Sequence, residues 1–143
     1  RAVVAARPVS DTSHLAEVVR DAIPAATRRR GGHPAKRTFQ AIRIEVNAEL
    51  DQLGDALDEA VRRLVPTGRG AVLSYHSGED RIVKHCFDRA ATGGCNCPRL
   101  LPCTCGATPL AVLPRRAGRV PSEDEARDNP RAASARLRVL ERR

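Results

Sequence analysis

The first half of the chain is dominated by hydrophobic positions three and four residues apart, the spacing of an amphipathic helix. Residues 1–7 have the pattern of a helix tail, and the N-cap signal at 10–13 opens a helix that ends at Pro24. The strongest pattern consists of Phe39, Ile42, Val46, Leu50, Leu53, Leu57, Val61 and Leu64. It predicts one long helix over 38–64, or two nearly continuous helices, ending at the turn 65–68.

The hydrophobic pattern changes after this turn. Residues 70–75 are a short apolar run that predicts a buried strand, and Ser77 followed by two acidic residues predicts the start of a helix. Three later segments complete the prediction: strands at 110–113 and 135–140, the latter from the alternation of Leu137 and Val139 with Arg136 and Arg138, and a short helix starting at 121–125. The order helix, strand, helix is typical of an α/β fold.

Three polar residues, Tyr75, His76 and Ser77, stand at the carboxyl end of the predicted strand. Ligands of open α/β sheets bind at the carboxyl ends of strands, so these residues form a candidate site. His76 has two interpretations. It can help to remove a proton from a substrate, because free imidazole titrates near neutral pH, or it can simply hold the strand-to-helix turn. Glu79 and Asp80 fit the simpler role of residues that interact with the helix dipole and cap.

Charge adds a candidate partner. The net charge is +8, and nearly all of the positive charge is arginine, which pairs well with phosphate. The basic residues nearest to Gly31 and Gly32 are Arg28, Arg29, Arg30, His33, Lys36 and Arg37. A basic, glycine-containing loop favours contact with nucleic-acid phosphate, whereas aromatic residues for base stacking are scarce. The alternative is a solvated loop in a chain whose arginine content reflects the base composition of its genome.

Four cysteines form two C-x-C pairs within eleven residues: Cys95, Cys97, Cys103 and Cys105. Four thiolates this close together can make a tetrahedral zinc site, although the spacing is tighter than the usual C-x2-C ribbon. The alternative is a reduced surface loop, because stable disulfides are rare in the cytosol. The remaining cysteine, Cys86, lies in the predicted helix and is expected to be a small core residue.

Length and composition set the frame for these motifs. The chain has 143 residues and 41% hydrophobic content, which is enough for one domain with a modest core. No run approaches the roughly 20 apolar residues that a membrane span needs, so we expect a cytoplasmic protein without a membrane segment. The chain contains no methionine and begins in what looks like the middle of a helix. We therefore expect it to be a piece of a longer protein.

Four segments in a specific order resemble a known family. They are "HPAKRTFQAIRIEVNAEL", "GRGAVLSYHSGEDRIVKHCF", "CNCP" with "CTCG", and "PSEDEARDNPRAASARLRVLER". Together they are similar to the MraW (RsmH) family, whose members are S-adenosylmethionine-dependent methyltransferases that modify N4 of a cytidine in 16S ribosomal RNA. The resemblance covers essentially all of residues 1–143 and implies the small ribosomal subunit as partner.

The resemblance also implies an architecture. Residues 71–75 would be the fifth strand of a class I, Rossmann-like methyltransferase sheet, with 110–113 as the sixth strand and 135–140 as an antiparallel seventh. On this interpretation residues 49–143 are the C-terminal half of the methyltransferase core. Residues 1–48 belong to a helical insertion domain that helps to admit the RNA.

In that family the Gly-rich cofactor loop and the acidic ribose-binding residue precede the region seen here. The resemblance therefore implies that no residue of this chain forms the main S-adenosylmethionine site, and that the chain alone is inactive. Tyr75, His76 and Ser77 would border the pocket from one side. Gly78 is a departure from the family, which usually has a large apolar residue there, and the family brings no required metal.

A second class of function is compatible with the same residues. A small, basic, zinc-stabilised nucleic-acid-binding module would need the cysteines and the arginines but no catalysis. The two hypotheses differ in what precedes the chain, because only the enzyme needs a preceding Rossmann half with a Gly-rich turn. The oligomeric state and the identity of a catalytic residue do not follow from the sequence.

Overall fold

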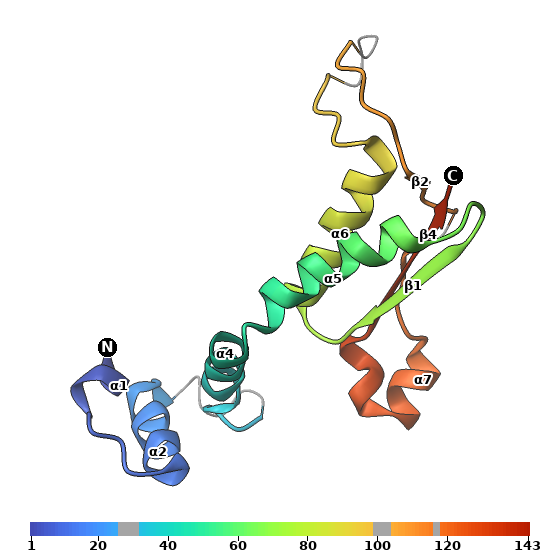
Figure 1. The fold of residues 1–143 in the computed structure, drawn as a ribbon. Coiled ribbons are helices and arrows are strands. Elements are labelled where there is room, and N and C mark those ends of the chain that lie inside the picture. Colours follow the sequence, from blue (N-terminus) through green and yellow to red (C-terminus); the bar gives the residue numbers. More distant parts are fainter. Residues whose placement is uncertain (26–31, 99–103, 116–117) are drawn as a thin grey trace. The chain divides into compact units, whose positions relative to one another are not determined.

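The structure, a computed structural model, describes four stretches of the chain: residues 1–25, 32–98, 104–115 and 118–143 (Figure 1). The chain divides into two compact units, Arg1–Glu49 and Leu50–Arg143, which are described separately below. None of the described helices is both long enough and apolar enough to cross a membrane.

The described part of the first unit is helical. Its helices are α1 (Ala2–Ala5), α2 (Thr12–Ala22) and α4 (Lys36–Asn47). Helix α2 begins after Asp11, whose carboxylate accepts a hydrogen bond from the backbone N–H of His14 at 2.9 Å. Val19 of α2 and Ala35 before α4 are buried, whereas Val46 of α4 is 77% exposed. Helix α4 thus shows much of its apolar stripe to solvent.

Helix α4 ends at Ala48, which has a left-handed backbone with φ 50°, and α5 (Glu49–Arg63) follows directly. The continuous hydrophobic pattern over 38–64 therefore corresponds to the second of its two predicted forms, a pair of nearly continuous helices. Helix α5 is amphipathic and buries Leu57 and Val61.

The second unit combines helices with a small antiparallel sheet. After α5 its elements are β1 (Arg69–Ser74), α6 (Ser77–Thr92), β2 (Ala111–Val112), β3 (Gly118–Arg119), α7 (Glu123–Asp128), the 3-10 helix η1 (Pro130–Ser134) and β4 (Arg136–Arg142). Strand β4 lies between β1 and β2 and is antiparallel to both, so β1 and β2 run in the same direction. Strand β3 also pairs with β4.

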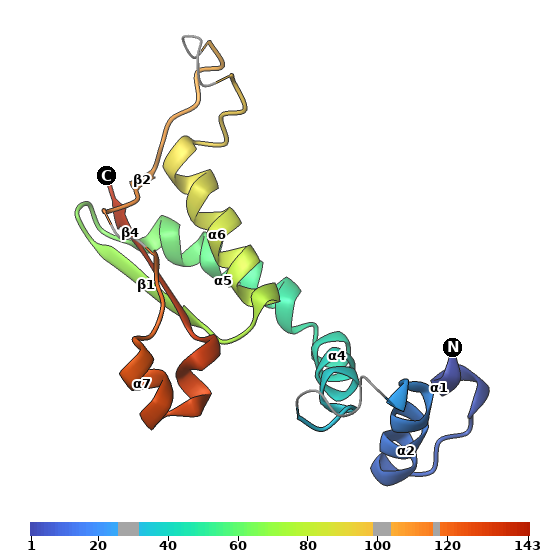
Figure 2. The same cartoon turned by 180° about the vertical axis from the view of Figure 1, so that it is seen from behind.

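The core of this unit lies between the sheet and helices α5 and α6, which Figures 1 and 2 show on one side of β1 and β4. Its buried members are Leu57, Val61, Val83, Cys86, Phe87, Ala90, Ala111 and Leu140. Cys86 is therefore a core residue, as the sequence predicted. Val83 and Leu140 are the largest fully buried side chains among the described residues.

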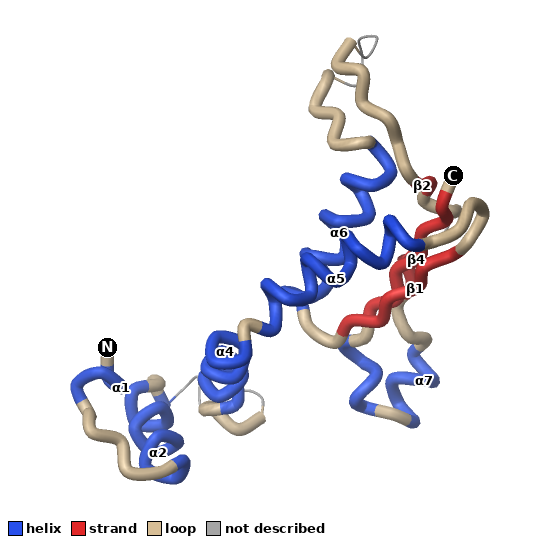
Figure 3. The backbone as a smooth tube through the Cα atoms, viewed as in Figure 1, coloured by secondary structure: helices blue, strands red, loops and turns tan. Residues whose placement is uncertain are grey.

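The predicted mixed α/β class is confirmed, and strands are found at all three predicted places (Figure 3). The alternation in the last strand does not identify its core-facing side, however. Leu137 and Val139 are only half-buried, whereas Leu140 on the opposite face is 1% exposed. Strand β3 was not predicted, because its surroundings contain neither an apolar run nor an alternating pattern.

Candidate functional site

The turn between β1 and α6 contains the three predicted site residues. Tyr75 follows the strand and is 54% exposed, His76 is the N-cap of α6, and Ser77 is the first residue of that helix. Just before them, Ser74 is buried, and its hydroxyl donates to the carbonyl oxygen of Arg136 at 3.3 Å. The end of β1 is thus fixed to the start of β4, and the turn is built on a rigid strand.

His76 and Glu79 cap the helix reciprocally. The Nδ1 atom of His76 accepts from the backbone N–H groups of Gly78 at 3.1 Å and Glu79 at 3.3 Å. In return, the Glu79 carboxylate accepts from the backbone N–H groups of Tyr75 at 2.9 Å and His76 at 3.3 Å. This is a capping box with histidine in the place usually taken by serine or threonine.

The second ring nitrogen of His76 is enclosed. Nε2 is buried 3.1 Å from Oε1 of Glu79, and it has no hydrogen-bond partner among the described residues. Because Nδ1 accepts two backbone hydrogen bonds, the cap requires the neutral tautomer with its proton on Nε2. His76 therefore holds the strand-to-helix turn.

Gly78 lies directly against this cap. A Cβ atom at this position would stand 3.1 Å from Nδ1 and Cε1 of His76 and 3.5 Å from Cδ1 of Leu50. A large apolar side chain at position 78 would therefore contact the imidazole ring and Leu50. The absence of that side chain leaves the ring less tightly held from this side.

A two-pronged ion pair joins the first turn of α6 to the sheet. Arg138 of β4 donates from Nε and Nη2 to the two carboxylate oxygens of Asp80, at 2.7 and 2.9 Å. Both side chains are three-quarters buried or more. The hydrogen bonds from Arg138 hold the pKa of the Asp80 carboxyl below its usual value, and Asp80 in turn raises the pKa of Arg138.

Cys86 contacts a second charged pair, between α5 and α6. Its thiol donates to Oδ1 of Asp58 at 3.0 Å, and Arg89 pairs with the same carboxylate. Burial, followed by the hydrogen bond to Asp58, raises the pKa of the Cys86 thiol to about 12. A thiol with this pKa stays protonated at neutral pH and is a poor nucleophile.

The predicted basic loop is described only in part. Arg28, Arg29 and Arg30 lie outside the described residues. His33, Lys36 and Arg37 are exposed, and the latter two form the start of α4. Among the described residues no side chain caps this helix, whose first turn contains no acidic residue. Positive charge at a helix start is locally unfavourable unless an anion is near.

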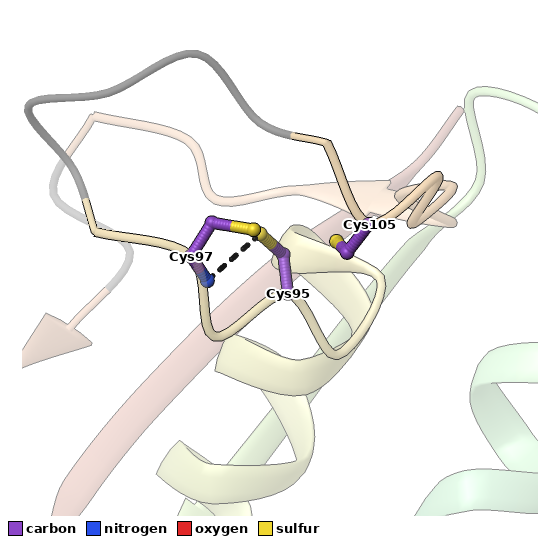
Figure 4. A group of neighbouring side chains, drawn as sticks. All are labelled: Cys95, Cys97 and Cys105. Atoms are coloured by element: carbon purple, nitrogen blue, oxygen red, sulfur yellow. Dashed lines mark hydrogen bonds between the residues drawn. The ribbon is translucent and has the colours of Figure 1, made fainter.

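Three of the four predicted metal-ligating cysteines come together at the far end of α6. The Sγ atoms of Cys95, Cys97 and Cys105 all lie within 4.8 Å of one another (Figure 4). Cys103 lies outside the described residues. This end of α6 is opposite to the end capped by His76, so the two candidate sites are separate.

Comparison with known proteins identifies the family. The sequence profile described as the MraW methylase family matches residues 1–143. The chain belongs to this family. It is 51% identical over 139 residues to the ribosomal RNA small subunit methyltransferase H of Heliobacterium modesticaldum, covering 96% of this chain and 44% of that protein. The protein of the same name from Paenibacillus sp. (strain JDR-2) is 50% identical over 146 residues, covering 99% and 46%. The chain thus spans less than half the length of these relatives.

Sequence reasoning found the cap residues of this MraW methylase family member but missed their supports. Arg138 was treated only as a polar residue of an alternating strand, although it fixes Asp80. Asp58 was not singled out at all, although it contacts both Cys86 and Arg89. No local spacing signals such pairs, because their partners are brought together by tertiary folding.

Proposed function

We propose that the full-length protein containing this chain methylates N4 of a cytidine in 16S ribosomal RNA, with S-adenosylmethionine as the methyl donor. The observation that carries the proposal is the match of all 143 residues to the MraW methylase family, with relatives named ribosomal RNA small subunit methyltransferase H at about half identity. The partner would then be the small ribosomal subunit, and the location the cytoplasm.

The fold of the second unit supports a place in a class I methyltransferase core. In this proposal β1, β2 and β4 are the fifth, sixth and seventh strands, and the antiparallel position of β4 between the other two agrees with it. Residues 49–143 form the C-terminal half of the core. Residues 1–48 form part of the helical insertion domain.

In this proposal the described residues form only part of the S-adenosylmethionine site. At the end of β1 the imidazole of His76 and the carboxylate of Glu79 are used by the helix cap, which leaves Tyr75 and Ser77 as the groups that can face a pocket. We infer that the cofactor is held mainly by the part of the enzyme that precedes this chain. Residues 1–143 alone are then inactive.

Methylation of an exocyclic amine needs in-line geometry, an accessible nitrogen lone pair, and an acceptor for the one proton that the amine loses. S-adenosylmethionine supplies the methyl group when bound. This chain contributes a rigid pocket wall, because Ser74 and the cap of α6 fix the turn that presents Tyr75. The exposed phenol ring can pack against a base that has left its helix. No described residue is assigned the proton-acceptor role.

The basic segment is proposed to contact the ribosomal RNA backbone through Arg28, Arg29, Arg30, His33, Lys36 and Arg37. The exposure of Lys36 and Arg37 and the uncapped start of α4 support it, since phosphate oxygens can accept hydrogen bonds from both side chains and backbone. The alternative of a non-catalytic, zinc-stabilised module also fits the cysteine cluster, but it does not explain the family match.

The function is tested with the natural full-length protein. Small ribosomal subunits from cells in which the corresponding gene is deleted are incubated with the protein and labelled S-adenosylmethionine, and the RNA nucleosides are separated by mass spectrometry. We expect label in N4-methylcytidine at one position of 16S RNA. Label on another atom, or on the large subunit, would refute the substrate assignment. Absence of label with folded, cofactor-binding protein would refute the activity.

A further inference from the structure

The segment that follows α6 is built as a loop whose two arms meet. Gly93 ends the helix with φ 65°, and a Cβ atom there would stand 2.6 Å from the carbonyl carbon of Thr108. Only glycine allows this approach of the two arms. Near the meeting point, the backbone N–H of Leu110 donates to the carbonyl oxygen of Ala90 at 2.9 Å. The base of the loop is thus fixed to the last turn of α6.

The cysteines come from both arms. Cys95 and Cys97 follow the helix end, while Cys105 precedes Gly106, a second position with a left-handed backbone at φ 69°. The backbone N–H of Cys95 donates to the carbonyl oxygen of Thr92 at 3.2 Å, which fixes the first cysteine to the helix. The glycines and the backbone hydrogen bonds at the base of the loop are thus consistent with the closeness of the three sulfurs (Figure 4).

One sulfur already accepts a backbone hydrogen bond. The N–H of Cys97 points to Sγ of Cys95 at 3.4 Å. This contact places the two cysteines of the first arm against each other.

The described residues of the loop form no core that could hold it in this form. None of the described residues between Gly94 and Leu110 is buried, and the apolar cluster of the unit ends at Ala90 and Ala111. Small folded units with too little hydrophobic core are commonly stabilised by disulfides or by a structural metal.

We propose that Cys95, Cys97 and Cys105 bind one Zn²⁺ ion as thiolates and thereby join the two arms of the loop after α6. Zinc–thiolate bonds of about 2.3 Å in a tetrahedron separate the sulfurs by about 3.8 Å, and the observed limit of 4.8 Å requires only a small contraction. Each thiol releases its proton when it becomes a ligand. The set contains no oxygen ligand of the kind that Mg²⁺ or Ca²⁺ prefers.

The site is independent of the proposed methyl transfer. It lies at the opposite end of α6 from the His76 cap, and its argument uses no cofactor or RNA. In this proposal zinc has a structural role, because the described residues of the loop are not buried and the ion would join its two arms. If the methyltransferase proposal failed, the zinc-site proposal would therefore still stand. If the zinc-site proposal failed, the family assignment would not change.

The first test is metal content. The natural full-length protein is purified without chelators under reducing conditions and analysed by elemental mass spectrometry. We expect about one zinc per chain, and its loss in the variants Cys97→Ser and Cys105→Ser. The matched control is Cys86→Ser, which changes the same residue type in the core of the same unit and keeps a hydrogen-bond donor for Asp58. This control should keep its zinc.

Affinity and ligand type are measured on the wild-type protein, so that no variant has to fold. Zinc is removed with a chelator and returned in competition with a chromophoric chelator, and Co²⁺ is added in parallel as a spectroscopic probe. We expect a tetrahedral cobalt spectrum with charge-transfer intensity for at least three thiolates. Loss of one direct ligand should weaken zinc binding by more than about a hundredfold, since even outer-shell changes cost about 10–100-fold.

Several results would overturn the proposal. These are wild-type protein without zinc that also fails to take it up after reduction, a cobalt spectrum with fewer than three thiolates, and a visible iron–sulfur chromophore in the fresh protein. Unchanged zinc content in both Cys97→Ser and Cys105→Ser would do the same. Protection of residues 93–108 from protease on addition of Zn²⁺, and not of Mg²⁺, would support the structural role.

Discussion

Arg138 of β4 and Asp80 of α6 form a bidentate ion pair in the second unit. The guanidinium of Arg138 donates hydrogen bonds to both carboxylate oxygens of Asp80, at 2.7 and 2.9 Å. The pair fixes the first turn of α6 on β4, next to the turn that presents Tyr75. The geometry of the proposed pocket wall therefore depends on a strand residue that is 58 positions away in the chain.

Replacing Arg138 by lysine should destabilise the full-length protein. A lysine keeps the charge but cannot form the two-pronged contact, and hydrogen bonds to charged groups contribute about 1.5–3 kcal/mol each when partly buried. We expect a loss of about 1–3 kcal/mol in the free energy of unfolding, measured by denaturant titration. The control Arg127→Lys, in an exposed ion pair with Asp124, should change stability by less than about 0.5 kcal/mol.

The same pair predicts a pH dependence. The pKa of Asp80 is lowered in the folded state. Asp80 therefore makes its full contribution to the free energy of unfolding above the unfolded pKa of about 3.9, and this contribution is lost as the pH falls from there towards the folded pKa. The stability difference between wild type and Asp80→Asn should thus be constant from pH 7 to about 5 and shrink below about 4. A difference that stays constant down to pH 3 would contradict this account.

His76 should act through the cap rather than through proton transfer. We expect His76→Ala to lose about 1 kcal/mol of stability, whereas His76→Asn keeps a cap acceptor and stays close to wild type. Methyl transfer by the folded His76→Asn variant should remain within a few-fold of wild type. A large fall in kcat without a change in stability or KM would instead assign the imidazole a part in the reaction.

The basic segment should contribute to the salt dependence of RNA binding. Each lost phosphate contact lowers the slope of log affinity against log salt by about 0.7–0.9, so changing Arg28, Arg29 and Arg30 to alanine should flatten it by about 2–3. Cofactor affinity should be unchanged. The matched control removes three exposed arginines that are already paired with acidic neighbours: Arg62, Arg63 and Arg127. Equal slopes for wild type and the Arg28–30 variant would show that the segment is only a solvated basic surface.

Residues 1–143 alone should bind S-adenosylmethionine weakly or not at all. In the proposed function this chain contributes only one wall of the cofactor pocket, and among the described residues β1 pairs with β4 on one edge only. We expect no heat of binding in calorimetry at micromolar cofactor, and self-association from the open edge of β1. A micromolar dissociation constant, or a sharp monomeric unfolding transition, would be the contrary result. The full-length protein is the positive control.

The elements with strong local signals were predictable. The apolar run of β1 and the acidic helix start after Ser77 are local features, and both were found. The break at Ala48 was not fixed by the sequence, because alanine carries no turn signal and the hydrophobic spacing continues through it. In β4, the alternation of Leu137 and Val139 favoured the wrong face, because the core residue Leu140 shares its face with Arg136 and Arg138. Local sequence patterns thus do not reveal contacts between residues that are far apart in the sequence.

The central position of β4 has a consequence for how the protein is made. Among the described residues the partner of β1 is β4, which is synthesised much later: Arg69 and Glu141, which form an ion pair across the two strands, are 72 residues apart. At about 5–20 residues per second, the ribosome needs roughly 4–14 s to add that length. During this interval the edge of β1 that pairs with β4 stays open on the nascent chain. The pairing of β1 with β4 therefore forms only after the last strand of this chain has emerged from the ribosome.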